Sequence, residues 1–158
     1  MSSDRISFEG LPSTVGQVVY GAPFVLSEED IENFHKGTWL DRAYPEDSVP
    51  DYPETLIEGF HLLSMLDAIA RFSSGHADDE MWGLNYGLDS VRFVSQVHRG
   101  DRIVPTFETL AVDRKDDGYK LLRRCTFTVE GQPRPGMIAD WWTFVLPTGV
   151  HEKNRRTP

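Results

Sequence analysis

The sequence predicts an α+β domain in which consecutive antiparallel strands wrap around one long buried helix. The helix is indicated by residues 52–72 (YPETLIEGFHLLSMLDAIARF), where only Ser64 and Asp67 are polar between positions 62 and 69. A helix that is hydrophobic nearly all round belongs inside a fold. The sheet is indicated by the second half of the chain, where strand follows strand with Gly and Asp turn signals between them.

Length and composition predict one soluble domain. Of the 158 residues, 39% are hydrophobic and 26% are charged, so we expect a single domain over residues 1–147 and a polar tail over 148–158. No apolar run approaches the roughly 18 residues that cross a bilayer, the first ten residues lack a signal sequence, and one cysteine cannot form an internal disulfide. These features predict a cytoplasmic protein without a membrane partner. The net charge of −9 repels phosphate backbones, which argues against a nucleic-acid partner.

The first half of the chain is expected to open with a short strand over residues 15–22. Ser27 then has the residue type and position of a helix N-cap, with Asp30 at the third helical position, and predicts a short helix over residues 28–35. Residues 36–53 are rich in proline and acidic residues, so we expect an irregular loop there. This loop leads into the buried helix and is placed to line its mouth.

The central helix is expected to begin at Thr55 and to run to about residue 72. Thr55 has Glu58 three residues after it, which is the spacing of a capping box. Glu58 and His61 are ionisable groups near the start of a helix that enters the core. Such groups are costly unless they are paired, and shifted titration in a cleft is a common mark of a functional site.

The second half of the chain reads as a series of strands. The expected strands cover residues 84–94, 102–113, 119–130 and 137–146. Asp116-Asp117-Gly118 is a strong hairpin signal between the second and the third of them. The third strand alternates between a mainly apolar face and a polar face, and its apolar face holds Leu121, Arg123, Cys125, Phe127 and Val129. One long helix followed by four or five antiparallel strands is the arrangement of the α+β hotdog fold.

Basic residues gather at Arg123 and Arg124 and again in the polar tail. Two interpretations of these clusters are open. They form solvated surface charge, which is the more common role of such runs, or they form a patch for a phosphorylated carrier arm.

Several segments resemble the MaoC-like hotdog family of acyl-thioester hydratases and dehydratases, over roughly residues 24–147. The similar segments are LNYGLDSVRF at 84–93, V-x-x-GDRI at 97–103, CTFTVEG ending at 131, MIADWWTFVLP at 137–147 and the helix start LIEGFHLLSML at 56–66. The resemblance implies a hotdog fold and an acyl thioester of coenzyme A or of an acyl carrier protein as substrate.

The chain departs from this family at the catalytic signature. The family's hydratases carry Asp-x-Asn-Pro-x-His, in which Asp and His handle the water at the β-carbon. Here Asp41 matches the acidic position, Ala43 stands in place of Asn, and Glu46 stands in place of His. The family's helix usually begins with His-Gly, whereas this one carries Glu58-Gly59. A related hotdog group, thioesterases that add an amine to an enoyl thioester before hydrolysis, shows that the scaffold tolerates such rearrangement.

Glu58 and His61 are the first candidates for catalysis. Glu58 is interpreted either as a base or nucleophile, or as the capping partner of Thr55. His61 lies three residues later on the same helical face, so the two side chains could form an acid–base couple. The alternative is that His61 is a hydrogen-bonded core residue. Asp41 is the further catalytic candidate on the ground of its family position, with solvated loop acid as the alternative.

The remaining candidates would bind the thioester carbonyl. The backbone N–H groups of Gly59 and Phe60 are available if they are unpaired at the helix start, with tight helix–sheet packing as the alternative for Gly59. Tyr44 and Tyr52 flank the loop that overhangs this point, where a phenol can donate a hydrogen bond, with aromatic packing as the alternative. The tryptophans are expected in the core or in the wall of an acyl tunnel.

The other histidines, His35, His76, His98 and His151, are expected at the surface. No pattern of metal-ligand spacing and no glycine-rich nucleotide loop occurs, so we expect neither a metal nor a cofactor.

Three functions follow from these features. The first is a MaoC-like hydratase or dehydratase with a rearranged acid–base set, and the second is a thioesterase, with or without β-addition. The third is a non-catalytic hotdog subunit that binds an acyl thioester or supports an active partner chain. In each case we expect a homodimer or a higher oligomer, because sheet edges and helix faces of this kind commonly join across a two-fold axis.

Overall fold

The structure is a computed structural model that describes residues 6–45, 49, 51–74 and 81–150. Its elements, in chain order, are a 3₁₀ helix η1 (Leu11–Thr14), β1 (Val18–Tyr20), α1 (Glu28–Thr38), α2 (Leu40–Ala43), α3 (Gly59–Ser64), α4 (Leu66–Ser73), β2 (Met81–Phe93), β3 (Ile103–Lys115), β4 (Gly118–Val129) and β5 (Met137–Pro147). None of the helices in these ranges is long and apolar enough to span a bilayer.

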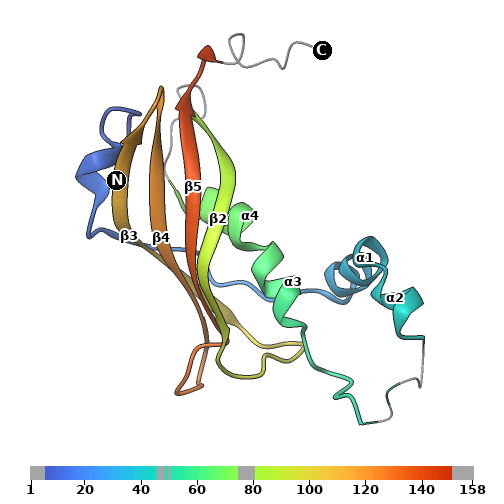
Figure 1. The fold of residues 1–158 in the computed structure, drawn as a ribbon. Coiled ribbons are helices and arrows are strands. Elements are labelled where there is room, and N and C mark those ends of the chain that lie inside the picture. Colours follow the sequence, from blue (N-terminus) through green and yellow to red (C-terminus); the bar gives the residue numbers. More distant parts are fainter. Residues whose placement is uncertain (1–5, 46–48, 50, 75–80, 151–158) are drawn as a thin grey trace, which may run out of the picture.

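The sheet has five antiparallel strands in the order β1-β3-β4-β5-β2. Figure 1 shows α3 and α4 lying along one face of this curved sheet, with α1 beside α3. The α+β hotdog architecture predicted from the order of elements is confirmed. The four long strands lie within three residues of their expected bounds. In β3, β4 and β5 this agreement follows from alternating burial and from the turn signals at the strand ends.

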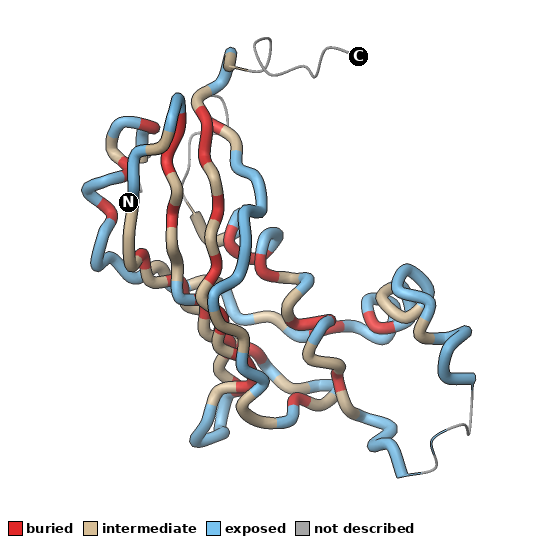
Figure 2. Tube along the Cα trace, in the orientation of Figure 1, coloured by how far each residue is buried: buried red, intermediate tan, exposed pale blue. Residues whose placement is uncertain are grey.

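The core lies between the helices and the three strands β3, β4 and β5. Leu62, Leu66 and Ile69 point from the helices into it and meet Phe107 and Phe127 of the sheet. Figure 2 shows buried and part-buried residues along β4 and β5, whereas β2 is mostly exposed. The edge strand β2 therefore contributes little to the core of the single chain.

The first half of the chain differs from expectation in three places. The first strand is only Val18–Tyr20, because Gly16 adopts a positive φ of 82° and turns the chain before it. The helix capped by Ser27 is confirmed, with Ser27 and Asp30 forming a reciprocal capping box, but it continues to Thr38. The expected irregular loop contains a short helix, α2.

The central helix begins at Gly59, four residues later than predicted. Thr55 is not its N-cap, because its hydroxyl is hydrogen-bonded to the Nδ1 atom of His98 at 2.9 Å. The backbone here is extended and pairs with a distant segment: the Ile57 N–H donates to the Val97 carbonyl at 2.8 Å. Glu58 is the N-cap residue, and its side chain makes no capping hydrogen bond. The predicted capping box between Thr55 and Glu58 is therefore wrong.

The central helix is also interrupted at Met65, which separates α3 from α4. The Ser64 hydroxyl donates to the His61 carbonyl at 2.7 Å and takes the acceptor that a regular helix offers to the Met65 N–H. That N–H instead donates to the Leu62 carbonyl at 3.2 Å, one residue closer than the regular pattern. One continuous helix to residue 72 was therefore the wrong prediction.

The sheet covers only one side of α3 and α4. Leu66 is buried and Leu63 is half-buried, as the wrapped helix requires. Phe72 is 82% exposed, and Phe60 is 72% exposed although its ring packs edge-on against Phe93 of β2. The apolar character of the helix on all faces thus leaves aromatic side chains largely in water in the single chain.

Candidate functional site

The most polar feature near the helix start is a histidine–carboxylate pair. His35 Nε2 lies 2.8 Å from Glu58 Oε1, and the two side chains are 29% and 20% exposed. His35 comes from α1, one turn after the buried Ile31, so the face of α1 that holds Ile31 also turns His35 inward. Glu58 comes from the N-cap of α3. The prediction that His35 lies at the surface is wrong.

His61 lies one turn into α3 and is buried, with 3% of its surface exposed. Its ring stacks in parallel on Phe34, with centroids 4.3 Å apart. Burial lowers the pKa of His61, and although the charges of Glu58 and Asp30 act in the opposite direction, the net shift is downward. The imidazole is therefore neutral around neutral pH.

Two atoms in this cluster can still accept a hydrogen bond. Glu58 Oε2 and His61 Nδ1 are shielded from solvent and have no hydrogen-bond partner among the described residues. The expected couple of Glu58 and His61 is an electrostatic one, since the charge of Glu58 raises the pKa of His61 against the effect of burial, but no hydrogen bond joins the two side chains in the described part of the chain. The cluster thus offers a carboxylate oxygen and a neutral imidazole nitrogen, with His35 holding the carboxylate in place.

Gly59 packs against the sheet. A Cβ atom added at Gly59 would lie 2.6 Å from Cγ of Phe93, so the packing interpretation of this glycine is supported. The N–H groups of Gly59 and Phe60 have no hydrogen-bond partner in the parts of the chain that the structure describes. Their role in carbonyl binding stays a prediction.

Tyr52 lies near the cluster. Partial burial raises the pKa of the Tyr52 phenol, and electrostatic repulsion by the charge of Glu58 raises it further. Asp41 lies exposed in α2, and Tyr44 follows it at 62% exposure. No contact among the described residues links either one to Glu58 or His61, and their roles stay predictions.

Some predicted positions lie outside the described residues. These are Glu46, His76, His151 and the tail from residue 151. Within the described ranges, no group of three or more His, Cys, Asp or Glu side chains is placed to hold a metal ion.

Clefts run between the helices and the sheet. One lies against Gly59 and Phe93 at the start of α3. A second lies beside β2 and shares Asp67, Asn85 and Trp141 with a third of about 400 Å³ under α4. The walls of the first two clefts are largely apolar, which suits an acyl chain, whereas the cleft under α4 mixes apolar and polar side chains.

The sequence also has relatives among characterised proteins, although no family model matches it. It is 28% identical over 150 residues to Nodulation protein N of Rhizobium leguminosarum bv. viciae, which covers 89% of this chain and 92% of that protein.

Solved structures with similar folds include enzymes of two kinds. The MaoC-like dehydratase from Rhodospirillum rubrum superposes with a TM-score of 0.65 at 11% identity, over 84% of this chain and 92% of that chain. A variant of the fluoroacetyl-CoA-specific thioesterase FlK superposes with a TM-score of 0.59 at 14% identity, over 89% of this chain and 96% of that chain. The resemblance to MaoC-like hotdog proteins is therefore confirmed at the level of the fold: this chain has the hotdog fold that a MaoC-like dehydratase and a thioesterase share.

Proposed function

We propose that this chain is an enzyme that adds water to, or removes it from, the β-carbon of an acyl thioester. The observation that carries the proposal is the 2.8 Å contact between His35 and Glu58 beside the neutral His61. At the position where the family signature has its histidine, this chain has Glu46. A carboxylate–histidine pair nevertheless forms, from α1 and the start of α3.

In the hydration direction, Glu58 Oε2 takes a proton from a water molecule as the water oxygen bonds to the β-carbon. The electron pair of the double bond moves toward the thioester carbonyl, where the N–H groups of Gly59 and Phe60 stabilise the negative charge. The proton then passes to the α-carbon. One water is consumed, no other reactant is needed, and Glu58 returns to its carboxylate form.

His35 and His61 have different tasks in this scheme. His35 orients the carboxylate through its hydrogen bond to Oε1, which leaves Oε2 for the water. His61 Nδ1 accepts a hydrogen bond from the water or from the hydroxyl group of the product. In this scheme the Tyr52 phenol, whose pKa is raised by burial and by the charge of Glu58, donates a hydrogen bond to the thioester.

Hydrolysis of the thioester is the second candidate. It is favoured by the position of Glu58 at the N-cap of α3, directly beside the N–H groups that would hold the carbonyl oxygen. In this reaction Glu58 directs water to the carbonyl carbon, and the thiol leaves. The superposition on a thioesterase supports this alternative.

A non-catalytic role is the third candidate. It is favoured by the exposed position of Asp41, which has no contact with the His35–Glu58 pair among the described residues. A chain with this function would bind an acyl thioester, of coenzyme A or of an acyl carrier protein, without converting it.

One assay separates the three candidates. Purified protein is incubated with crotonyl and 3-hydroxybutyryl thioesters, and the enoyl absorbance and the free thiol are followed separately. A change in absorbance without thiol supports hydration, and release of thiol supports hydrolysis. If neither signal changes while the thioester still binds, the proposal of an enzyme is wrong.

We also propose that the active form is a homodimer joined at β2. This edge strand leaves Leu84, Tyr86, Leu88 and Phe93 between 44% and 49% exposed. A long edge strand with apolar side chains is a template for pairing with another chain. A second copy on this edge would extend the sheet and cover apolar surface that the single chain leaves in water.

A further inference from the structure

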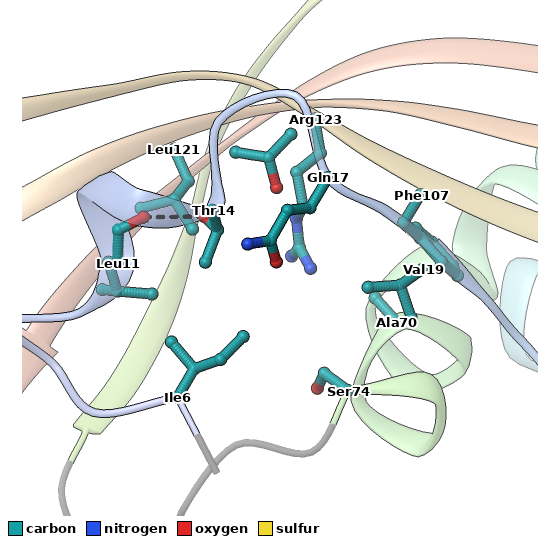
Figure 3. Close-up of a pocket in the computed structure, with 11 residues that line it drawn as sticks. Ile6, Leu11, Thr14, Gln17, Val19, Ala70, Ser74, Phe107, Leu121 and Arg123 are labelled. Carbon is teal, nitrogen blue, oxygen red and sulfur yellow. Dashed lines mark hydrogen bonds between the residues drawn. The ribbon is translucent and has the colours of Figure 1, made fainter. Parts of the chain in front are cut away.

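Arg123 is a buried cation without a matching anion. The residue is half-buried, its Nε is shielded from solvent, and burial is the main cause that lowers the pKa of its guanidinium group. No hydrogen bond or ion pair to Arg123 occurs among the described residues, and its recorded contact is with the Trp141 ring, 4.7 Å from the ring centroid. Figure 3 shows the guanidinium reaching into the space between the N-terminal segment and α4.

Arg124, the next residue along β4, has the anionic partner that Arg123 lacks in the described part of the chain. Arg124 lies on the opposite face of β4, is exposed, and forms a two-pronged ion pair with Asp140 at 2.8 and 2.9 Å. The interpretation of Arg123 and Arg124 as solvated surface charge is right for Arg124 and wrong for Arg123. The side-chain alternation of a strand turns Arg123 toward the helices.

A second open polar group lies on the same face of the sheet. Arg123 pairs across the strands with Trp141, and Thr143 is two residues further along β5, so both residues point to the same side. The Thr143 hydroxyl is buried and has no hydrogen-bond partner in the described part of the chain. Arg123 and Thr143 both line the cleft of about 400 Å³ under α4.

Asp67, Asn85 and Trp141 also line this cleft and are already engaged with one another. The Trp141 indole N–H donates to Asn85 Oδ1 at 3.1 Å, and Asn85 Nδ2 donates to Asp67 Oδ2 at 3.3 Å. Asp67 attracts Arg123 over a distance but is not within ion-pair range of it. Arg123 Nε and the Thr143 hydroxyl are thus two shielded groups of this cleft that no hydrogen bond in the described part of the chain satisfies.

These two groups are suited to a carboxylate. A buried charge is costly unless it is paired, and burial alone lowers the pKa of the Arg123 guanidinium. The planar guanidinium binds the two oxygens of a carboxylate in a fork, and a hydroxyl can donate to the same group. The rest of the wall includes apolar side chains such as Ala70, Leu121 and Val145, which suit methylene groups.

We propose that the cleft under α4 receives the acyl chain of a thioester that ends in a carboxylate, and that Arg123 and Thr143 bind this carboxylate. The inference rests on the proposed function, because it takes the substrate to be an acyl thioester. Gly59 and Ala70, which lies beside Arg123, are separated by about eleven helical positions, or roughly 16 Å at 1.5 Å per residue. The inference therefore adds the substrate class: acyl chains of about twelve carbons that end in a carboxylate are preferred over equally long chains that end in a methyl group.

The test compares dodecanedioyl and dodecanoyl thioesters of N-acetylcysteamine, which have the same chain length and differ at the terminal carboxylate. Neither contains phosphate. Dissociation constants are measured by calorimetry, with tryptophan fluorescence as a second readout. We expect the dodecanedioyl thioester to bind roughly tenfold to a hundredfold more tightly, the range for a hydrogen bond to a charged group.

Variants identify the residues responsible. Arg123→Met is expected to remove the preference for the dodecanedioyl thioester while leaving dodecanoyl binding unchanged, and Thr143→Val is expected to reduce it in part. Arg124→Met is the matched control and is expected to keep the preference. If circular dichroism shows that Arg123→Met is unfolded, Arg123→Lys replaces it, since it keeps the charge but loses the fork that a carboxylate needs.

The outcomes separate this inference from the proposed function. If the wild-type protein binds both thioesters equally, the carboxylate site is refuted and the proposed function stands. If it binds neither thioester in these forms or as coenzyme A derivatives, the proposed function fails and the inference with it. If Arg123→Met weakens dodecanedioyl and dodecanoyl coenzyme A equally, Arg123 binds the phosphates of the coenzyme, and the assignment to the acyl end is wrong.

Discussion

Replacing Glu58 by Gln tests the central element of the proposed site. The substitution keeps the shape of the side chain and an oxygen that accepts a hydrogen bond from His35, but it removes the proton acceptor at Oε2. Loss of a positioned base typically lowers turnover by about a hundredfold to ten-thousandfold. At about 1.36 kcal/mol for each factor of ten, the barrier rises by roughly 3 to 5 kcal/mol.

The same substitution has a much smaller expected effect on folding. Glu58 makes no capping hydrogen bond, and its contact with His35 can be kept by the amide oxygen, so we expect a change within about 1 kcal/mol. For a domain of this size that is a shift of roughly 2 to 4 °C in the thermal midpoint. A structural role for Glu58 would give the reverse pattern, with a lower midpoint and normal turnover by the folded fraction.

The assay measures turnover of crotonyl thioester and the thermal midpoint on the same preparations. Glu54→Gln is the matched control, because Glu54 is an exposed glutamate in the segment before the helix. His61→Ala is expected to lower turnover as well, with a larger loss of stability because it leaves a gap beside Phe34. Full turnover by both site variants would refute the reasoning and shift attention to Asp41 and Tyr44.

Three further predictions concern pH, packing and assembly. Because burial lowers the pKa of His61 from 6.5, the unfolded chain binds more protons below about that pH, so the free energy of unfolding should fall as the solution is acidified. Denaturant titrations should show this slope in the wild type and a weaker one in His61→Gln, and equal slopes would contradict the assignment. Gly59→Ala should destabilise the fold by roughly 1 to 3 kcal/mol, since the new Cβ would meet the Phe93 ring at 2.6 Å, whereas Gly37→Ala in open space should be harmless in the same thermal scan. Light scattering at micromolar concentration should give about twice the chain mass of 18.0 kDa, and Leu88→Lys on the β2 edge should shift it toward the monomer; a wild-type mass near 18 kDa would count against the dimer.

Much of the fold could be predicted from residues that are close in the sequence. The Ser27–Asp30 capping box and the hairpin at Asp116-Asp117-Gly118 were predicted correctly, because each depends on backbone conformation over three or four residues. The strands of the second half were recognised from side-chain alternation, which also placed Arg123 on the inward face of β4.

The start of the central helix could not be predicted in this way. Residues 55–57 have a local capping pattern, but their backbone pairs with residues 97–99, about forty positions later, and this keeps them extended until Gly59. A contact over such a separation leaves no local sequence pattern. The same is true of His35, whose partner Glu58 is 23 positions away.

The sequence by itself determined the class of fold, the strand boundaries and the helix whose start carries Glu58 and His61, because these follow from local propensity and hydrophobic periodicity. Only the tertiary structure decided that His35 meets Glu58, that His61 is buried against Phe34, and that Arg123 is enclosed while Arg124 pairs with Asp140. The physical reason is the range of the interactions. Secondary structure is set over a few residues, whereas the partner and the burial of an ionisable side chain depend on elements that meet only when the chain has folded.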